Sequence, residues 1–452
     1  MKNAALRISP VLLAIPCVAL AAPAFHFERT SNGLVLQGAS GSVHHKLQQL
    51  EHSSTLWLDV PPGNYKVTLT FDARSSVRTT IKAETRRLMV LEASSDSPRS
   101  FVVNVRTPTL TPPPANAPGA SAVRLNPAEL SSLNWDDGLT LEFIEGDRAI
   151  RALDIQAADV PTIYLAGDST VTDQAEEPNA SWGQMLPRFV ADTAAVANHA
   201  KSGATLKSFL TELRLDKILE SLRAGDWLLI QFGHNDQKTQ WPQSYADAST
   251  TYRSYLRAYI AEARRRGATP ILITSPERRN FDAADHIVNS HGDYPHAVRT
   301  IAKDESVALV DLYAMSKTFY EALGPRRAPL AFGQNGEDRT HHNNYGAYEL
   351  ARMIVLGLRN ADPKLTANIT KHLIDEPGFN PARPDDPVRL SIPASSPLSA
   401  HEGVGAASRD DGFVTSDSAL ATKMTPVASI DRRDLTVQSL PGNSSWTNMH
   451  FE

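Results

Sequence analysis

The 452-residue sequence has a single cysteine, Cys17, and little net charge, at −5. Because one thiol cannot form an intramolecular disulfide, the stability of the fold must come from its hydrophobic cores. Hydrophobic residues make up 41% of the chain, which is ample for packed cores and excludes a disordered chain. The small net charge gives no reason to expect a nucleic-acid partner.

The chain also lacks an apolar run long enough to span a membrane. The apolar stretch near its N-terminus is too short for a transmembrane helix and has the pattern of an export signal. Lys2 and Arg7 precede this stretch, and residues 19–21, Ala-Leu-Ala, are the small residues of a cleavage site. We therefore predict a signal peptide over residues 1–21 and a secreted or periplasmic protein whose mature form has lost Cys17.

Residues 22–158 show the alternation of apolar and polar positions that is typical of half-buried β-strands. The runs that alternate lie at residues 54–60, 64–72, 78–84, 99–106, 139–146 and 151–157. Several short strands with turn residues between them predict a β-sandwich domain. The proline-rich stretch 107–119 should be a surface loop inside it.

From Thr162 onward, strand-like runs alternate with segments of helical spacing. The runs at 162–167, 194–200, 226–233, 269–275 and 307–313 predict strands, and the segments at 182–190, 205–223, 252–267, 294–305 and 345–359 predict helices. This alternation predicts an α/β domain over residues 159–374, with a parallel sheet covered by helices on both faces. A proline- and serine-rich tail over residues 375–452 should wrap around the protein or stay partly disordered.

Parallel sheets bind ligands beyond the carboxyl ends of their strands, and polar residues follow several of the predicted strands. Ser169 follows the first strand, Gly203 the second and Asn235 the third, and Asp338 and His341 precede the last helix. Each has a structural explanation, because serine caps helices, glycine permits a positive φ and asparagine favours turns. Together, however, they supply a nucleophile, a base, a carboxylate that orients the base, and donors for an oxyanion, which favours catalysis.

The chain resembles the SGNH, or GDSL-type, hydrolases, which are named for Ser, Gly, Asn and His in four sequence blocks. The blocks here are GDST with Ser169, SGATLKSF with Gly203, GHND with Asn235, and DRTH with Asp338 and His341. Within that superfamily, GDSTVTDQ, SWGQMLPRF and FGHNDQK are similar to rhamnogalacturonan acetylesterases and their bacterial relatives. Chain spacing alone leaves His342 as an alternative base, whereas the DxxH pattern of the family selects His341.

The resemblance covers about residues 161–359 and implies a flavodoxin-like, three-layer α/β/α hydrolase domain. The preceding sandwich would be of the galactose-binding or jelly-roll type. Ser169, Asp338 and His341 would form the catalytic triad, and the N–H groups of Ser169 and Gly203 with the Asn235 amide would form the oxyanion hole. The implied activity removes acetyl groups from plant cell-wall polysaccharide, foremost pectic rhamnogalacturonan, through an acetyl-enzyme on Ser169 and without a metal or cofactor.

Two other functions stay open at this point. One is an SGNH esterase that acts on other acyl esters, such as xylan acetyl groups, aryl esters or lipids. The other is a carbohydrate-binding protein with an inactive hydrolase fold, which the full set of catalytic residues argues against. The fold alone does not decide the substrate.

Candidate substrate contacts are Trp182, His234, Arg278, Arg279 and His342. Trp182 could instead belong to the core. The two arginines could contact an anionic sugar such as galacturonate, or they could form ion pairs within the protein. His342 stands where the family commonly has an aromatic residue or threonine. The charged residues around Arg86 and Arg87 in the sandwich could serve a contact between domains. No stretch has a recognised metal-ligand spacing, so no metal site is predicted.

Overall fold

A computed structural model describes residues 24–31, 33–39, 44–50, 52–72, 74–93, 98–111, 121–145 and 147–397. The predicted signal peptide, residues 112–120 of the proline-rich stretch and residues 398–452 of the tail lie outside these ranges. No helix within the described ranges is both long enough and apolar enough to cross a membrane.

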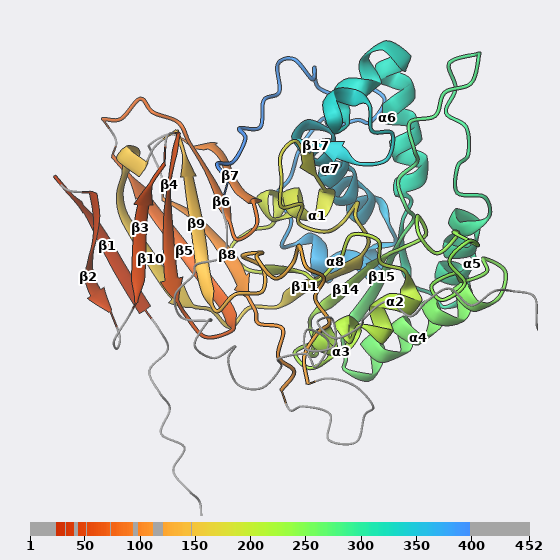
Figure 1. The fold of residues 1–452 in the computed structure, drawn as a ribbon, viewed down its shortest axis with the longest axis horizontal. Coiled ribbons are helices and arrows are strands. Elements are labelled where there is room, and N and C mark those ends of the chain that lie inside the picture. The colour runs from red at the N-terminus through yellow and green to blue at the C-terminus, as the bar shows by residue number, and fades with distance from the viewer. Residues whose placement is uncertain are drawn as a thin grey trace, which may run out of the picture. The chain divides into compact units, whose positions relative to one another are not determined.

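The N-terminal region consists of antiparallel strands (Figure 1). They are β1 (Ala24–Thr30), β2 (Gly33–Ala39), β3 (His45–Gln49), β4 (Ser53–Asp59), β5 (Gly63–Phe71), β6 (Thr79–Ala83), β7 (Arg87–Ala93), β8 (Arg99–Val105), β9 (Gly138–Ile144) and β10 (Ile150–Ala157), with a 3₁₀ turn, η1 (Asp147–Ala149), before β10. One sheet has the order β3-β4-β9-β6-β7, and the other strands follow one another as β8-β5-β10-β1-β2. All six predicted strands are present, whereas β1, β2, β3 and β7 were not predicted.

The two groups of antiparallel strands share one hydrophobic core. Leu56 and Leu141, which are partners across β4 and β9, belong to the same buried cluster as Val67 of β5 and Ile155 of β10. Alternate residues of each strand therefore face a common interior, as the period-two pattern predicted. The more specific galactose-binding or jelly-roll type stays a prediction.

The region after residue 158 alternates strands and helices. Its elements are β11 (Thr162–Gly167), β12 (Asn179–Ala180), α1 (Trp182–Met185), η2 (Leu186–Phe189), β13 (Ala195–Asn198), α2 (Leu206–Thr211), α3 (Arg214–Leu219), β14 (Trp227–Gln231), α4 (Thr251–Arg265), β15 (Thr269–Ile273), α5 (Tyr294–Asp304), β16 (Ala308–Val310), α6 (Leu312–Arg327), η3 (Ala328–Ala331), η4 (Gln334–Gly336), β17 (His342–Asn343), α7 (Asn344–Asn360) and α8 (Pro363–Thr370). Strands β16-β15-β14-β11-β13 lie side by side and are parallel. Numbered along the chain, this is the flavodoxin-like order 2-1-3-4-5.

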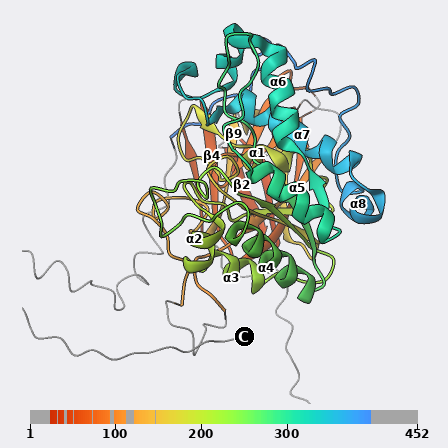
Figure 2. The ribbon, with the colours of Figure 1, turned by 90° about the vertical axis from the view of Figure 1, so that its right-hand side faces the viewer.

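Helices cover both faces of the parallel strands. Ile163 and Leu165 of β11 lie in one buried cluster with residues of α1, α6 and α7. Tyr164 and Ala166, which alternate with them, lie in a second cluster with residues of α2, α3, α4 and α5. Figure 2 shows α2, α3 and α4 at the bottom of the view and α6 and α7 at the top. The sheet is therefore the middle of three layers, which explains why its strands are apolar throughout.

The parallel and antiparallel strands join in a single ten-stranded sheet. β13 pairs in parallel with β8 at Val196 and Val103, so the order is β16-β15-β14-β11-β13-β8-β5-β10-β1-β2. This pairing covers an edge of the parallel sheet that would otherwise expose unpaired backbone groups. The boundary at residue 158 was predicted from a change of periodicity. In the structure, the pairing of β8 with β13 joins the strands on the two sides of this boundary.

Some helices differ from the prediction. Residues 205–223, predicted as one helix, form α2 and α3, because Leu213 between them has a left-handed φ of 60° that no helix can continue through. Helices α6 and α8 were not predicted. Gly324, with a φ of 70°, and Pro325 interrupt the last part of α6, so its sequence lacks a clear helical pattern.

The described part of the C-terminal segment wraps back to the N-terminal strands. Ser396 N–H donates to Glu142 of β9 at 2.8 Å, and Lys82 Nζ of β6 donates to Pro393 O at 2.7 Å. Nearer its start, Asp385 O accepts a hydrogen bond from Tyr345 of α7 at 2.7 Å. Residues 385–396 thus connect α7 to the antiparallel strands.

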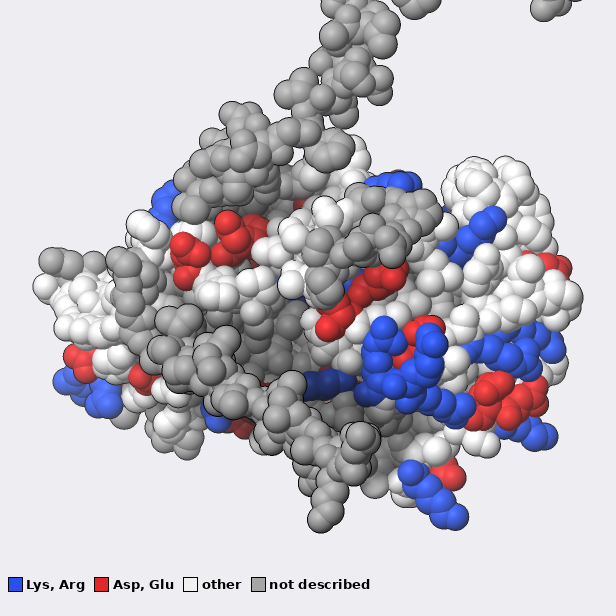
Figure 3. Space-filling view, turned by 90° about the horizontal axis from the view of Figure 1, so that it is seen from below, with Lys and Arg blue, Asp and Glu red and all other residues white. Residues whose placement is uncertain are grey.

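Charged side chains of both signs are interspersed on the face shown in Figure 3, in keeping with the net charge of −5. Arg257 of α4 lies 3.0 Å from Glu305, and Arg266, just after α4, lies 2.9 Å from Glu262. Pairs at the surface, such as these partly exposed ones, contribute only about 0–1 kcal/mol each to stability.

A buried ion pair between β7 and the loop after β11 should matter far more for stability. Arg87 Nε lies 2.7 Å from Asp173 Oδ2, and their side chains are 2% and 0% exposed. Replacing Arg87 with alanine leaves the Asp173 charge buried without its partner, so we expect Arg87→Ala to lower the free energy of unfolding by about 3–5 kcal/mol. Chemical denaturation followed by circular dichroism measures this loss.

Arg78→Ala is the matched control, because Arg78 pairs with Glu92 of β7 at 3.4 Å and both side chains are well exposed. Its loss should cost about 0–1 kcal/mol. Equal, small losses in the two variants would show that the buried pair contributes no more than the exposed one.

Candidate active site

Ser169 lies just beyond the carboxyl end of β11, in a tight turn. The N–H groups of Val171 and Thr172 both donate to Asp168 O at 3.0 Å, which closes the turn. Gly167 before it is required by space, since an added Cβ would lie 2.5 Å from Val171 Cγ2. The turn does not lead directly into a helix, because α1 begins at residue 182 with Ser181 as its N-cap. Ser169 is therefore no helix cap, and it lies in a turn.

The side chain of Ser169 is hydrogen-bonded to a histidine 172 positions further along the chain. Ser169 Oγ lies 2.9 Å from His341 Nε2, and His341 Nδ1 lies 2.8 Å from Asp338 Oδ2. Asp338 Oδ1 also accepts the N–H groups of Thr340 at 2.6 Å and His341 at 2.9 Å. Although burial raises the pKa of Asp338, these hydrogen bonds outweigh it and hold the pKa well below its usual range. The carboxylate therefore stays ionised beside the imidazole.

His342, the alternative base, points away from Ser169 into the core. It is 1% exposed, its Nε2 lies 2.7 Å from Tyr320 Oη, and its ring stacks against Tyr320. Burial lowers the pKa of His342 to about 3, so the ring stays neutral. Successive side chains of an extended segment point to opposite sides, which separates the two neighbouring histidines. The structure thus corrects the prediction of a substrate contact at His342.

The loops after β11, β13 and β14 meet beside Ser169 because these strands are neighbours. Gly167 and Gln231, at the ends of β11 and β14, are register partners. Beyond them, Asp168 Oδ2 lies 3.3 Å from His234 Nδ1. Both groups are fully buried, and burial lowers the pKa of His234, so a neutral ring donates its Nδ1–H to an ionised Asp168.

The predicted oxyanion donors lie on these same loops. Asn235 Nδ2 donates to Ala204 O at 3.1 Å, and Asn235 Oδ1 accepts from Lys238 Nζ at 2.8 Å. An amide nitrogen carries two hydrogens, so Asn235 retains one for another acceptor. Gly203, next to Ala204, is exposed and has a φ of 80°, a conformation that favours glycine. His234 is buried against Asp168, so the predicted substrate contact at His234 is also corrected.

Trp182 supports the turn that carries Ser169 from within the core. It is 1% exposed, and its Nε1–H donates to Gln231 Oε1 at 2.7 Å. Gln231 Nε2 in turn donates to Thr170 Oγ1 at 2.7 Å. Because no face of the indole is free, Trp182 cannot stack on a sugar, and its candidate role as a substrate contact is wrong.

Arg278 and Arg279 follow β15 on the predicted edge, but their guanidinium groups bind backbone carbonyls of the site. Arg278 Nη2 donates to His234 O at 3.3 Å, and Arg279 Nη2 donates to Asp338 O at 3.2 Å. Arg279 N–H also donates to Arg339 O at 2.8 Å. These contacts fix the positions of the loops that carry Asn235 and Asp338. Both arginines thus have partners within the protein and are only partly buried, so contact with substrate stays a prediction for them.

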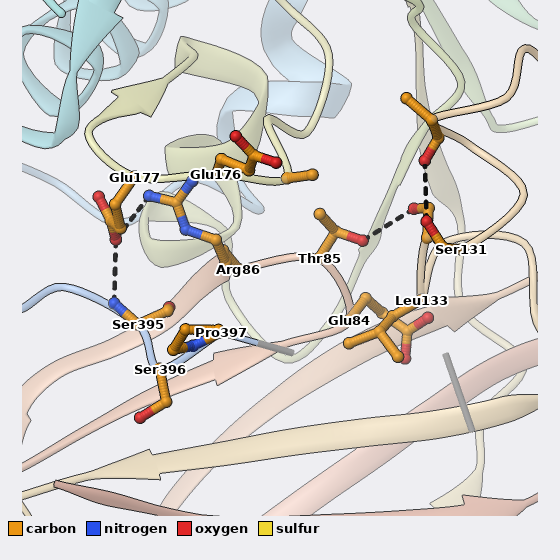
Figure 4. Close-up of a pocket in the computed structure, with 13 residues that line it drawn as sticks. Glu84, Thr85, Arg86, Ser131, Leu133, Glu176, Glu177, Ser395, Ser396 and Pro397 are labelled. Carbon is orange, nitrogen blue, oxygen red and sulfur yellow. Dashed lines mark hydrogen bonds and ion pairs between the residues drawn. The ribbon is translucent and has the colours of Figure 1, made fainter. Parts of the chain in front are cut away.

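A pocket of about 510 Å³ lies between the N-terminal strands and the loop after Ser169 (Figure 4). It is lined by residues 84–86, 128 and 131–133, 175–177 and 395–397. Arg86 Nη2 lies 2.6 Å from Glu177 Oε1, and Ser395 N–H donates to the same oxygen at 2.9 Å. Although burial raises the pKa of Glu177, the charges of Arg86 and Lys82 lower it, so the carboxylate stays ionised.

The loop that carries Ser169 is anchored next to this pocket, by contacts with the N-terminal region. Gln174 Nε2 donates to Ser169 O at 2.6 Å, and Gln174 O accepts from Arg86 Nη1 at 3.0 Å. Arg86 and Arg87, at the start of β7, thus contact the loop after β11. The sequence had suggested such a contact between domains for these residues. Across the described ranges, no group of three or more His, Cys, Asp or Glu side chains is arranged to hold a metal ion.

The chain is similar to known esterases over this region. Residues 165–347 match the GDSL-like lipase/acylhydrolase family. Rhamnogalacturonan acetylesterase RhgT of Bacillus subtilis is 38% identical over 229 residues, which cover 48% of this chain and 95% of that protein. The probable rhamnogalacturonan acetylesterase YesY of the same organism is 37% identical over 212 residues, which cover 46% of this chain and 97% of that protein.

A crystal structure of the protein YxiM from Bacillus subtilis superposes with a TM-score of 0.43 at 25% identity, over 68% of this chain and 80% of that chain.

The segment that matches the family contains Ser169, Gly203, Asn235, Asp338 and His341. RhgT and YesY are matched over nearly their whole length. The chain therefore belongs to the GDSL-like lipase/acylhydrolase family and is a carboxylic ester hydrolase.

Proposed function

We propose that the protein is a carbohydrate acetylesterase that removes acetyl groups from pectic rhamnogalacturonan. The observation that carries this proposal is the continuous hydrogen bonding from Ser169 Oγ through His341 to Asp338, at 2.9 and 2.8 Å. The similarity to RhgT and YesY supports the choice of substrate. The predicted signal peptide supports export to the compartment where such a polymer is met.

The geometry supports a mechanism with an acetyl-enzyme. Ser169 Oγ attacks the carbonyl carbon of the acetyl ester, and His341 Nε2 accepts the hydroxyl proton. Asp338 holds the other ring nitrogen and stabilises the imidazolium that forms. When the tetrahedral intermediate collapses, the proton on His341 passes to the departing sugar oxygen. Water, activated by the same histidine, then hydrolyses the acetyl-serine and restores Ser169.

The negative charge of the tetrahedral intermediate needs donors that are in place beforehand. We assign this role to the N–H groups of Ser169 and Gly203 and to the second amide hydrogen of Asn235. Losing one such donor typically slows a reaction about 10²–10³-fold. Because the Asn235 amide is held by Ala204 O on one side and by Lys238 on the other, its hydrogen is oriented before the substrate arrives.

The domain boundaries at residues 22–158, 159–374 and 375–452 belong to the same proposal. The hydrolase region carries Ser169, Asp338 and His341, and the antiparallel strands support the nucleophile loop through Arg86 and Arg87.

Ser169→Ala should abolish the release of acetate, since no other group replaces the nucleophile. We expect a loss of at least about 10³-fold in kcat with acetylated rhamnogalacturonan, measured as acetate by mass spectrometry. A panel with acetylated xylan and 4-nitrophenyl acetate tests the substrate at the same time. Wild-type protein that cleaves xylan esters but not pectic ones would contradict the substrate, and equal release by Ser169→Ala would remove Ser169 from its role.

The neighbouring histidines provide a matched pair of variants. His341→Gln should lower kcat by about 10³-fold or more while leaving the melting temperature close to that of the wild type, because His341 is partly exposed and accepts the serine proton. His342→Gln should lower the melting temperature, because it breaks the buried contact with Tyr320, and should retain most of the turnover of the folded protein. Thermal unfolding and 4-nitrophenyl acetate hydrolysis separate the two effects. The reverse result would assign the base to His342.

A further inference from the structure

Trp241 is exposed at the rim of the candidate active site. The residue is 44% exposed, and every other Trp, Tyr and Phe among the described residues is buried or half-buried. Burial of an indole stabilises a fold because its apolar surface is large. An indole that stays exposed beside a catalytic loop therefore suggests a ligand. Aromatic rings bind sugars by packing against the apolar C–H face of the sugar ring.

Consecutive turns bring Trp241 close to Asn235. Lys238 N–H donates to Asn235 O at 3.1 Å, and Trp241 N–H donates to Lys238 O at 3.0 Å. The ammonium group of Lys238 lies 4.6 Å from the centroid of the Trp241 ring and 2.8 Å from Asn235 Oδ1. One cation therefore connects the exposed ring to the amide that we assign to the oxyanion hole.

Lys238 has fewer hydrogen-bond partners within the protein than the neighbouring Arg278. Arg278 Nη1 donates to Ser290 O at 3.2 Å and its Nη2 donates to His234 O, so its guanidinium is engaged within the protein. Within the described ranges, Lys238 Nζ has Asn235 Oδ1 as its one hydrogen-bond partner, and an ammonium has three donors. Burial and the positive charge of Arg278 both lower the pKa of Lys238, so a nearby anion would be favourable for it.

We propose that Trp241 and Lys238 form a subsite for a uronic acid next to the acetylated sugar of the substrate. The ring of the acidic sugar packs against the indole, and its carboxylate accepts a hydrogen bond from the Lys238 ammonium. Lys238 is also a positioning residue, because it holds the Asn235 amide. This inference rests on the proposed acetylesterase function and specifies its substrate as an acidic polysaccharide.

The experiment compares three esters at low and high salt. They are acetylated rhamnogalacturonan oligosaccharides, which contain galacturonate, acetylated xylo-oligosaccharides, which are neutral, and 4-nitrophenyl acetate, which has no sugar. The wild type should prefer the acidic oligosaccharide, and this preference should weaken as salt screens the carboxylate from Lys238. The readout is the ratio of kcat/KM for the acidic and neutral oligosaccharides.

Trp241→Ala should lower kcat/KM for the acidic oligosaccharide about ten-fold, mainly through a higher KM, because the stacking surface is lost. Trp241→Phe, which keeps an aromatic ring, should recover most of this loss. Val35→Ala is the control, since Val35 is an exposed apolar residue on β2, and it should change none of the kinetic constants.

Lys238→Met should lower the acidic-to-neutral ratio about ten-fold and remove its dependence on salt. It should also lower kcat with 4-nitrophenyl acetate, because the Asn235 amide loses its support. Lys238→Arg keeps the charge and should retain the ratio.

An acidic-to-neutral ratio that is the same in wild type, Trp241→Ala and Lys238→Met would overturn the subsite, as would a wild type without preference at low salt. Either result leaves acetylesterase activity itself intact. Failure of the wild type to release acetate from any carbohydrate, while it hydrolyses 4-nitrophenyl acetate, would instead overturn the proposed function.

Discussion

The parallel pairing of β11 with its neighbours β13 and β14 is the constraint on which the site depends. Because parallel strands end at the same edge, the loops after Gly167, Asn198 and Gln231 emerge side by side. The chain can then place a hydroxyl, an amide and a buried Asp168–His234 contact within one small region. His341 reaches the same edge from the loop before α7, 172 positions beyond Ser169.

The antiparallel strands contribute to the site through buried charge as well as through the shared sheet. Arg87 binds Asp173, and Arg86 binds the backbone of the next residue, Gln174, just after the turn that carries Ser169. Burying charged groups is costly unless they are paired, so these contacts specify one position for the loop. The N-terminal region is therefore part of what holds Ser169 in place, and the loop is not supported by the parallel sheet alone.

Much of the fold could be predicted because the patterns that carry it are local. Period-two alternation indicated the strands around Leu56 and Val67, and apolar runs indicated all five parallel strands. The break at Leu213 could not be predicted, since a left-handed residue leaves no mark on hydrophobic spacing. The roles of Trp182 and His234 were misjudged because each precedes or follows a loop of the site in sequence, while its buried side chain turns to a partner from another element.

The sequence by itself determined which residues could supply the chemistry, since the GDST and GHND blocks place Ser169 and Asn235 after strands and the DRTH block places Asp338 and His341 before the last helix. Chain spacing alone left His341 and His342 as alternatives, and the family pattern favoured His341. The tertiary structure shows which ring meets Ser169, because the direction of each ring depends on contacts with Tyr320 and Ser169 from elsewhere in the chain. It likewise decided that Arg278 hydrogen-bonds the backbone of His234, whereas Lys238 lies against the ring of the exposed Trp241. Burial is a property of contacts between distant residues, and spacing along the chain does not contain it.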